Sequence, residues 1–305
     1  MVPPVTESEW QRYFALYQQS PQYQLINKGM SLADFKEIFF WEYIHRLVGR
    51  LIGVVFGLPL IWLVWKKKLS QQWKKHLGMI FFLGGCQGVL GWYMVKSGLI
   101  AEPRVSPYRL AAHLSLALLI LIYLVCLIAE NSRRFRSFRL ATSSQPLFRG
   151  ALLMTILLVM QVAVGAFMAG LKAGLLYNTF PTMNGYWVPP GLWQLQPLYL
   201  NFFENPVTVQ FIHRILGGLI FLATVTLALY LRKTPVLSWL GYLLLLMTVS
   251  QVGLGVYTLL SPGNLYLASL HQALGTILLV FSALLTYSLW KKKEIERILP
   301  YGRQI

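Results

Sequence analysis

The sequence is poor in cysteine and in acidic residues. Its 305 residues include 2 cysteines and 10 Asp or Glu, against 27 Lys or Arg. Cys86 and Cys126 both lie inside apolar segments, where cysteine most simply serves as a small core residue. We therefore expect no disulfide in the outer loops and no metal site built on cysteine. The first residues, Met1 to Pro4, also lack the features of a signal peptide.

Charged residues of any kind are scarce, at 12% of the chain, while 56% of the residues are hydrophobic. The apolar residues form runs long enough to cross a bilayer as helices, which takes about 20 residues. Backbone groups in lipid must be satisfied within their own segment, so these runs are expected to be helical. The sequence predicts an all-α integral membrane protein with seven spans, at about 43–65, 77–95, 109–129, 150–171, 207–231, 236–259 and 266–290.

The net charge of +17 would suggest nucleic-acid binding in a soluble protein, but here the basic residues are concentrated in alternate loops. Basic clusters follow the first, third, fifth and last predicted spans, at 66–75, 133–149, 232–233 and 291–293. The positive-inside rule places these loops in the cytoplasm. We expect a multi-pass protein of the cell inner membrane that contacts lipid and no nucleic acid, with a cytoplasmic carboxyl terminus and an outer amino-terminal segment.

Four of the five histidines lie near the predicted outer ends of spans and have a small residue four positions later. These pairs are His45 with Gly49, His113 with Ala117, His213 with Gly217 and His271 with Gly275. Residues i and i+4 share a helix face, so each imidazole has a shallow notch beside it that suits a flat porphyrin. Two histidines on separate helices of one bundle suit an iron porphyrin held at both axial positions. The four are thus predicted to be haem-iron ligands.

A zinc site and a role for the fifth histidine are both less favoured. A zinc site is disfavoured because no carboxylate or cysteine accompanies the histidines at a ligand spacing such as His-x-x-x-His. His76 is followed four positions later by Ile80 and lies in a lysine-rich stretch near the predicted inner face. It lacks the small neighbour, and we expect it to have no role at a porphyrin.

The chain contains an internal repeat. The His-Arg pair at 45–46 returns at 213–214, and the glycine-rich segment 84–91 has a counterpart at 250–255. Spans one to three therefore match spans five to seven, which predicts two pseudo-symmetric bundles on a four-helix plan. The partner of span four is expected just before Met1, with an apolar groove on the first bundle where it would pack. The predicted division is a first haem-binding bundle with its outer amino-terminal segment at 1–130, a basic cytoplasmic linker at 131–149, a second four-helix haem-binding bundle at 150–290 and a cytoplasmic tail at 291–305.

The two repeats differ beside their first histidine. Glu42 lies three positions before His45 and shares its helix face, whereas the equivalent residue before His213 is Gln210. A carboxylate at only one pocket marks that pocket as a reacting site and the other as a cofactor site. The alternative is that Glu42 only pairs with Arg46, four positions on.

Three arginines accompany the histidines. Arg46 and Arg214 directly follow their histidines and are predicted to pair with porphyrin propionates, or else to reach the membrane surface as snorkelling side chains. Arg50 lies a turn deeper, where an unpaired cation is costly. The loop 172–206 is long and rich in aromatic residues, which predicts a cap over an outer-facing site or an interfacial aromatic belt.

Several segments resemble the haem A synthases, the membrane enzymes that convert haem O to haem A for terminal oxidases. These are residues 23–31, 41–49, 174–181, 201–205 and 210–214. The resemblance covers essentially the whole chain and is to the branch that lacks an outer-loop cysteine pair. That family has eight spans in two four-helix bundles, so this sequence departs from it by the first helix. The resemblance implies haem b held by one histidine pair and haem O near the other, with a methyl group of haem O oxidised to formyl.

The predicted residue roles follow the two repeats. The predicted catalytic residues are Glu42, His45 and His113; the substrate-binding residues are Arg46, Arg50, Gly49 and Ala117; and the haem b-binding residues are His213, His271, Arg214, Gly217 and Gly275. Two other functions stay open, a di-haem b electron-transfer cytochrome and a haem carrier or exporter. A pure electron relay has no need of a carboxylate at one iron only, which favours the synthase. Haem O is the expected substrate, and haem O synthase, an electron-transfer protein and a second copy of the chain are left open as partners.

Overall fold

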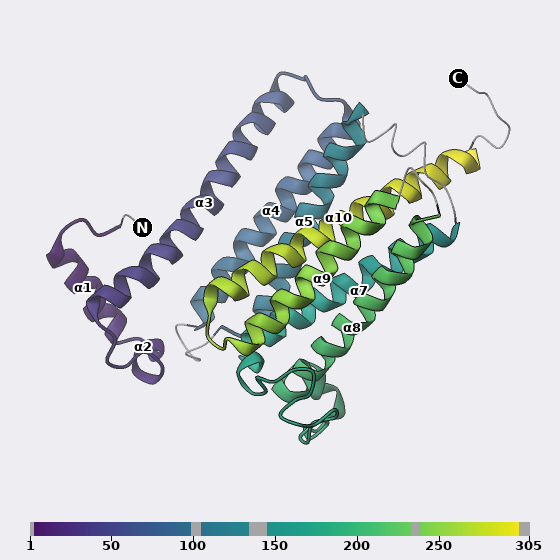
Figure 1. The fold of residues 1–305 in the computed structure, drawn as a ribbon. Helices are drawn as coiled ribbons and strands as arrows, with labels where there is room; N and C mark the ends of the chain where they lie inside the picture. Colours follow the sequence, from purple (N-terminus) through teal and green to yellow (C-terminus); the bar gives the residue numbers. More distant parts are fainter. Residues whose placement is uncertain (1–2, 99–104, 134–144, 234–237, 299–305) are drawn as a thin grey trace. The chain divides into compact units, whose positions relative to one another are not determined.

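The computed structural model describes residues 3–98, 105–133, 145–233 and 238–298. Throughout these residues the regular structure is helical, apart from an isolated β-bridge between Met183 and Tyr186. Seven of the helices in the described part are long and apolar enough to cross a membrane (Figure 1). The prediction of an all-α, multi-pass membrane protein with seven spans is confirmed.

The helices follow the predicted spans closely. The spanning helices are α3 (Leu32–Trp65), α4 (Gln71–Gly98), α5 (Pro107–Asn131), α7 (Gln145–Gly170), α8 (Pro206–Leu231), α9 (Ser238–Leu260) and α10 (Leu265–Ile298). The short helices α1 (Glu7–Gln18) and α2 (Pro21–Leu25) precede them, and η1 (Ala173–Leu175) and η2 (Leu198–Phe202) lie between α7 and α8. We call the connection 171–205 the cap loop.

Helix α3 begins well before the predicted start of the first span. The Ser31 side chain accepts a hydrogen bond from the Asp34 backbone N–H, and the Asp34 carboxylate accepts one from the Ser31 backbone N–H, which forms a capping box. From this cap the helix continues for 34 residues, or about 50 Å at 1.5 Å per residue. Since the hydrocarbon layer is about 30 Å thick, the first turns of α3 can stand outside it.

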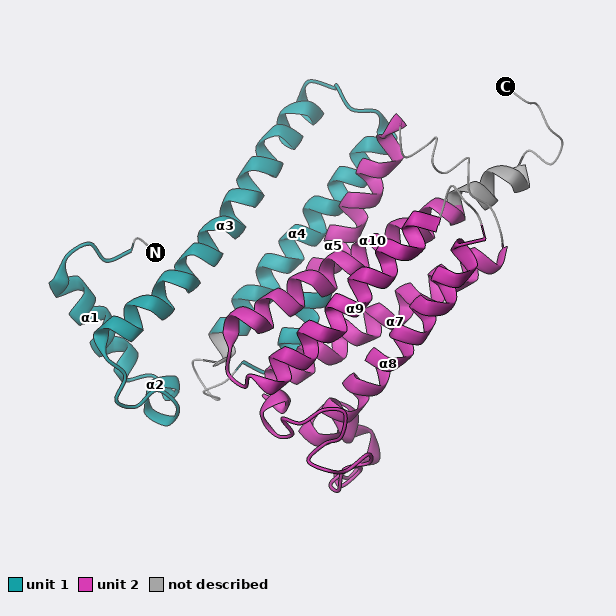
Figure 2. Cartoon of the chain, viewed as in Figure 1, with its two compact units in different colours: residues 1–116 teal, residues 117–305 magenta. Residues whose placement is uncertain are grey.

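The chain divides into two compact units, Met1–Leu116 and Ala117–Ile305 (Figure 2). This boundary falls within α5, whereas the sequence predicted a first bundle that ends at residue 130. The four-part division remains a prediction, and its linker and tail lie partly outside the described residues, at 134–144 and 299–305.

The second unit contains a four-helix bundle formed by α7, α8, α9 and α10 (Figure 1). Its core includes the fully buried side chains of Met154, Leu244 and Leu278. Hydroxyl groups also pair across helices in this bundle: Thr224 Oγ1 lies 3.2 Å from Thr248 Oγ1. Such interhelical hydrogen bonds replace the water that lipid cannot supply.

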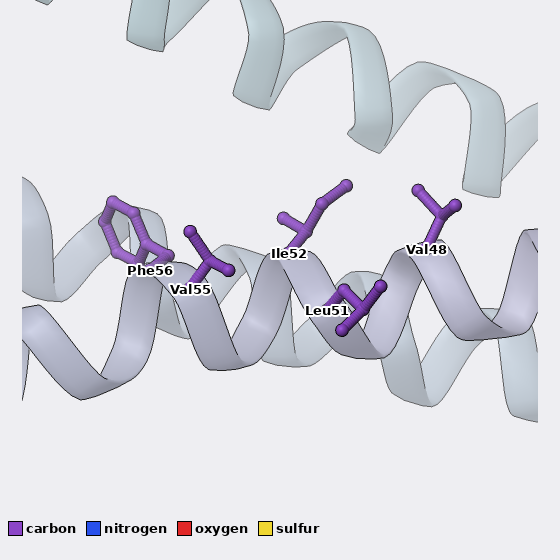
Figure 3. Close-up of a pocket in the computed structure, with 5 residues that line it drawn as sticks. All are labelled: Val48, Leu51, Ile52, Val55 and Phe56. Atoms are coloured by element: carbon purple, nitrogen blue, oxygen red, sulfur yellow. The ribbon is translucent and has the colours of Figure 1, made fainter.

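The first unit is more open. Gly57 of α3 meets Phe81 of α4 so closely that a Cβ atom on Gly57 would lie 2.9 Å from the Phe81 ring. Yet only 6% of the most apolar stretch of α3 is buried, against 39% for α10. An open apolar groove with a volume of ≈ 420 Å³ runs along α3 (Figure 3), lined by Val48, Leu51, Ile52, Val55 and Phe56. An apolar groove was expected beside the first bundle.

Candidate functional site

The second unit brings His213 and His271 together. His213 is the eighth residue of α8 and His271 the seventh residue of α10, and their ring centroids are 6.5 Å apart with the planes turned by 66°. The Nδ1 atoms of both are buried without a hydrogen-bond partner among the described residues. An imidazole nitrogen left without a protein partner inside an apolar bundle is available as a metal ligand.

The first unit repeats this geometry with His45 of α3 and His113 of α5. Their ring centroids are also 6.5 Å apart, with an interplanar angle of 67°. His45 is exposed and His113 half-buried, and the His113 Nδ1 has no partner in the described part of the chain. The fifth histidine, His76, instead contacts the ring of Trp73, with ring centroids 6.2 Å apart. The sequence-predicted pairing of histidines is therefore present in both units.

The spacing within each pair fits one metal ion between the rings. Metal–imidazole bonds of about 2 Å on both sides of an ion, with half of each ring added, place the ring centres about 6 Å apart. Within the described ranges, no three or more His, Cys, Asp or Glu side chains are grouped so that they could hold a metal ion together. Two axial nitrogens and an otherwise apolar setting are the donor set that a haem iron takes.

Three glutamines contact these histidines, and the sequence prediction missed them. The Nε2 atoms of Gln87, Gln161 and Gln251 donate to the backbone carbonyl oxygens of the histidines, at 3.0, 3.1 and 2.9 Å respectively. The histidines reached in this way are, in the same order, His113, His213 and His271. The sequence holds a signal for them, because each glutamine opens a Gln-x-x-x-Gly segment in the helix that packs beside its histidine.

The small residues predicted to make room for a porphyrin have a second neighbour. A Cβ atom on Gly275 would lie 3.0 Å from Gln251 Nε2, and one on Gly217 would lie 3.6 Å from Gln161 Nε2. Gly49, by contrast, has nothing within 4 Å of its Cβ position among the described residues. The notches at Gly217 and Gly275 thus admit a glutamine amide, and their predicted contact with porphyrin remains a prediction.

Glu42 and Gln210 differ in their surroundings as well as in charge. Glu42 Oε2 forms an ion pair with Arg46 Nη2 at 3.2 Å. Both side chains are partly exposed, Glu42 at 52% and Arg46 at 34%. Gln210 is fully buried, and its Nε2 donates to the Tyr177 carbonyl at 3.0 Å. The first unit therefore presents a carboxylate one turn before its histidine, whereas the second presents an amide that is already used to hold the cap loop.

Arg214 also holds the cap loop. Its guanidinium donates to the carbonyl oxygens of Tyr177 at 2.9 Å, Thr179 at 2.9 Å and Thr182 at 3.2 Å. These contacts join Arg214 to the cap loop and not to a propionate. The pairing of Arg214 with a porphyrin propionate remains a prediction for the haem-bound protein. Arg50, predicted to touch substrate, is exposed one turn beyond Arg46 on α3.

The Arg214 contacts predict a loosened cap loop in the Arg214→Gln variant. Charged donors contribute about 1.5–3 kcal/mol per hydrogen bond, so loss of about 2 kcal/mol of local stability would speed amide exchange in residues 177–182 by roughly 30-fold. Hydrogen–deuterium exchange with mass spectrometry measures this directly. The matched control is Arg232→Gln, at the exposed far end of the same helix. Equal exchange in the two variants would show that Arg214 does not anchor the loop.

A family model described as "COX15-CtaA: Cytochrome oxidase assembly protein" matches residues 1–283. The chain is similar to a heme A synthase of Nitrosospira multiformis, with 41% identity over 299 residues that cover 97% of this chain and 82% of the relative. The corresponding protein of Parvibaculum lavamentivorans is 44% identical over 272 residues, with 89% and 78% covered. That of Agrobacterium fabrum is 43% identical over 286 residues, with 92% and 77% covered.

Proposed function

Because the chain belongs to the COX15-CtaA family of cytochrome oxidase assembly proteins, we propose that it acts as a haem A synthase, the function named for its relatives. It is an enzyme of haem A biosynthesis in a membrane. The proposed reaction is oxidation of a methyl substituent of haem O to the formyl group of haem A by successive hydroxylations. The observation that carries the proposal is the presence of two alike histidine pairs, only one of which has a carboxylate one turn away.

The proposed reaction needs groups that handle protons. Conversion of a methyl to a formyl group removes four electrons from the carbon and adds one oxygen atom. With water as the source of oxygen, four protons are released, and an oxidant such as dioxygen or a redox protein takes the electrons. Glu42 is placed to accept protons beside His45, because a carboxylate near the reacting carbon can act as a general base.

The first unit supplies the proposed substrate site. Glu42, His45 and Ile52 recur at helical spacing and share one face of α3, and Ile52 belongs to the apolar groove (Figure 3). The hydrophobic part of haem O can lie against this groove while His45 and His113 take the axial positions. Arg46 and Arg50 provide cations for the propionates, and Gly49 leaves space beside His45.

The second unit supplies the proposed cofactor site. His213 and His271 would hold haem b, which when bound supplies one-electron transfer chemistry. Gln210 gives this pocket a neutral side chain, and Arg214 fixes the cap loop next to the pair. We further propose that the cap loop and the histidines face the outer side of the cell inner membrane, with the carboxyl terminus in the cytoplasm, since the basic loops follow the opposite helix ends. Haem O synthase and an electron-transfer protein are the proposed partners.

Expression in a bacterium that makes haem O and no haem A tests the function. Membranes containing the chain are expected to accumulate haem A, identified by chromatography and mass spectrometry of extracted porphyrins. The His45→Ala variant, expressed to the same level, is expected to leave haem O unconverted. Haem b alone, with no haem A from a membrane-inserted parental chain, would contradict the proposal.

A di-haem electron-transfer cytochrome is the second candidate. The observation in its favour is the equal centroid separation of the two pairs, 6.5 Å in each unit, because two permanent haems would require the same spacing. The same extraction separates the two functions, since a relay would yield two haem b per chain and no haem A.

A further inference from the structure

We propose that three glutamine–glycine pairs are positioning residues that set the place and tilt of the haem-ligating histidines. The pairs are Gln87 with Gly91, Gln161 with Gly165, and Gln251 with Gly255, which act on His113, His213 and His271 respectively. This inference rests on the proposed function only in taking these three histidines as haem ligands. We call each glutamine with its glycine a clamp.

The glutamine of each clamp fixes both the backbone and the ring of its histidine. Besides donating to the histidine carbonyl, Gln87 Nε2 lies 3.3 Å from His113 Nε2, Gln161 Nε2 lies 3.2 Å from His213 Nε2, and Gln251 Nε2 lies 3.5 Å from His271 Nε2. One amide therefore reaches two atoms of the same residue. A rotation of the ring or a slide of its helix would break at least one of these contacts.

The glycine of each clamp lets the ring approach the neighbouring helix. A Cβ atom on Gly255 would lie 2.7 Å from His271 Cε1, one on Gly91 would lie 3.0 Å from His113 Cε1, and one on Gly165 would lie 3.5 Å from His213 Cε1. The first two distances are below ordinary van der Waals contact. At Gly255 and Gly91 the lack of a side chain thus determines how closely the ring approaches the neighbouring helix, whereas a methyl group would fit beside the ring at Gly165.

Burial of a glutamine amide in an apolar bundle costs free energy, which supports a specific role for these glutamines at the histidines. The Oε1 atoms of Gln87, Gln161 and Gln251 are buried without a hydrogen-bond partner among the described residues, and an unmet buried acceptor costs about 1–3 kcal/mol. A residue used only to join two helices could be smaller and fully paired, as Thr224 and Thr248 are. Residues that hydrogen-bond to a metal-ligating histidine typically alter metal affinity by about 10–100-fold. Tighter haem binding can therefore offset the cost of the unpaired glutamine oxygen.

Leucine substitutions test the glutamine half of the clamp. Gln161→Leu and Gln251→Leu keep the size of the side chain but remove the amide, and are expected to weaken retention of haem b about tenfold and to shift its midpoint potential and low-spin EPR g values. The control is Thr224→Val, which removes an interhelical hydrogen bond of the same bundle away from the histidines. It is expected to leave the potential and the g values unchanged.

Alanine substitutions test the glycine half and remain informative if a leucine variant fails to fold. The distances predict a graded effect within the second unit: Gly255→Ala should displace His271 and change the EPR spectrum, whereas Gly165→Ala should give a nearly parental spectrum. Equal effects of the two alanine variants would contradict the proposed contact of ring and glycine.

The outcome is separable from that of the proposed function. Parental haem retention, potential and g values in both leucine variants would overturn the clamp, as would equal changes in Thr224→Val. Haem A formation is measured independently on the parental chain. Shifted spectra without any haem A would refute the synthase and support the clamp, whereas haem A formation with unshifted spectra would do the reverse.

Discussion

Replacement of His213 or His271 by alanine is expected to leave the purified protein with less than about a tenth of its haem b, because one of two axial ligands is lost. The ring centroids of this pair are 6.5 Å apart, so the remaining histidine cannot reach both sides of the iron. The helices themselves should persist, since their cores are formed by other side chains such as Met154 and Leu244. Pyridine haemochrome spectra of purified protein give the haem b content per chain.

The chain contains its own control for this result. His76 is a histidine at the start of a spanning helix that contacts Trp73, and no histidine pair includes it. His76→Ala should keep parental haem b. Full haem b with an unchanged low-spin spectrum in both His213→Ala and His271→Ala would show that the haem is held elsewhere.

Glu42→Gln is expected to slow conversion of haem O by about 100-fold or more, the range of a lost general base, while haem b content stays parental. Gln is the residue that the second repeat carries at the equivalent position, Gln210, so the substitution preserves size and hydrogen bonding. It also removes an ion pair that is partly exposed, and such pairs contribute only about 0–1 kcal/mol to stability. Quantifying haem O, the hydroxylated intermediate and haem A over time should show arrest before haem A.

Two variants separate the effect of losing the Glu42 carboxylate as a base from the effect of losing its ion pair with Arg46. Arg46→Gln breaks the same pair and leaves the carboxylate, so it should weaken substrate retention without arresting the substrate that is bound. Glu37→Gln makes the same change at an exposed position of α3 and should convert haem O normally. A parental conversion rate in Glu42→Gln would reduce Glu42 to a structural partner of Arg46.

The spans and the histidine pairs could be predicted because they depend on periodic, local signals. Apolar runs of bilayer length fixed the seven helices to within a few residues at most ends, and the repeat indicated which histidines belong together. The start of α3 was the largest difference. The capping box at Ser31 and Asp34 that opens this helix lies in a polar segment before the apolar run, so the length of the apolar run alone does not locate the start of the helix.

The glutamines and the role of Arg214 could not be predicted in the same way. A glutamine inside an apolar helix is a weak signal alone, and its partner lies on another helix at a distance that only packing determines. The position of Arg214 directly after a histidine predicts contact with a propionate, which remains a prediction, but it gives no sign that the guanidinium binds three carbonyls of an irregular loop. The conformation of an irregular loop leaves no periodic pattern of residues in the sequence. The same holds for buried Asn201, whose Nδ2 donates to the Leu195 and Leu198 carbonyl oxygens of this loop.

Porphyrin stoichiometry in the purified chain distinguishes a synthase with one cofactor haem and one substrate haem from a cytochrome with two permanent haems. The protein is purified from cells that supply haem O, and its bound porphyrins are extracted, separated and counted against protein. We expect about one haem b per chain together with haem O, its hydroxylated intermediate or haem A. We expect His113→Ala to remove only haem O and its oxidation products, and His271→Ala to remove haem b. Two haem b per chain, with no haem O or haem A in any preparation, would contradict the proposed synthase function.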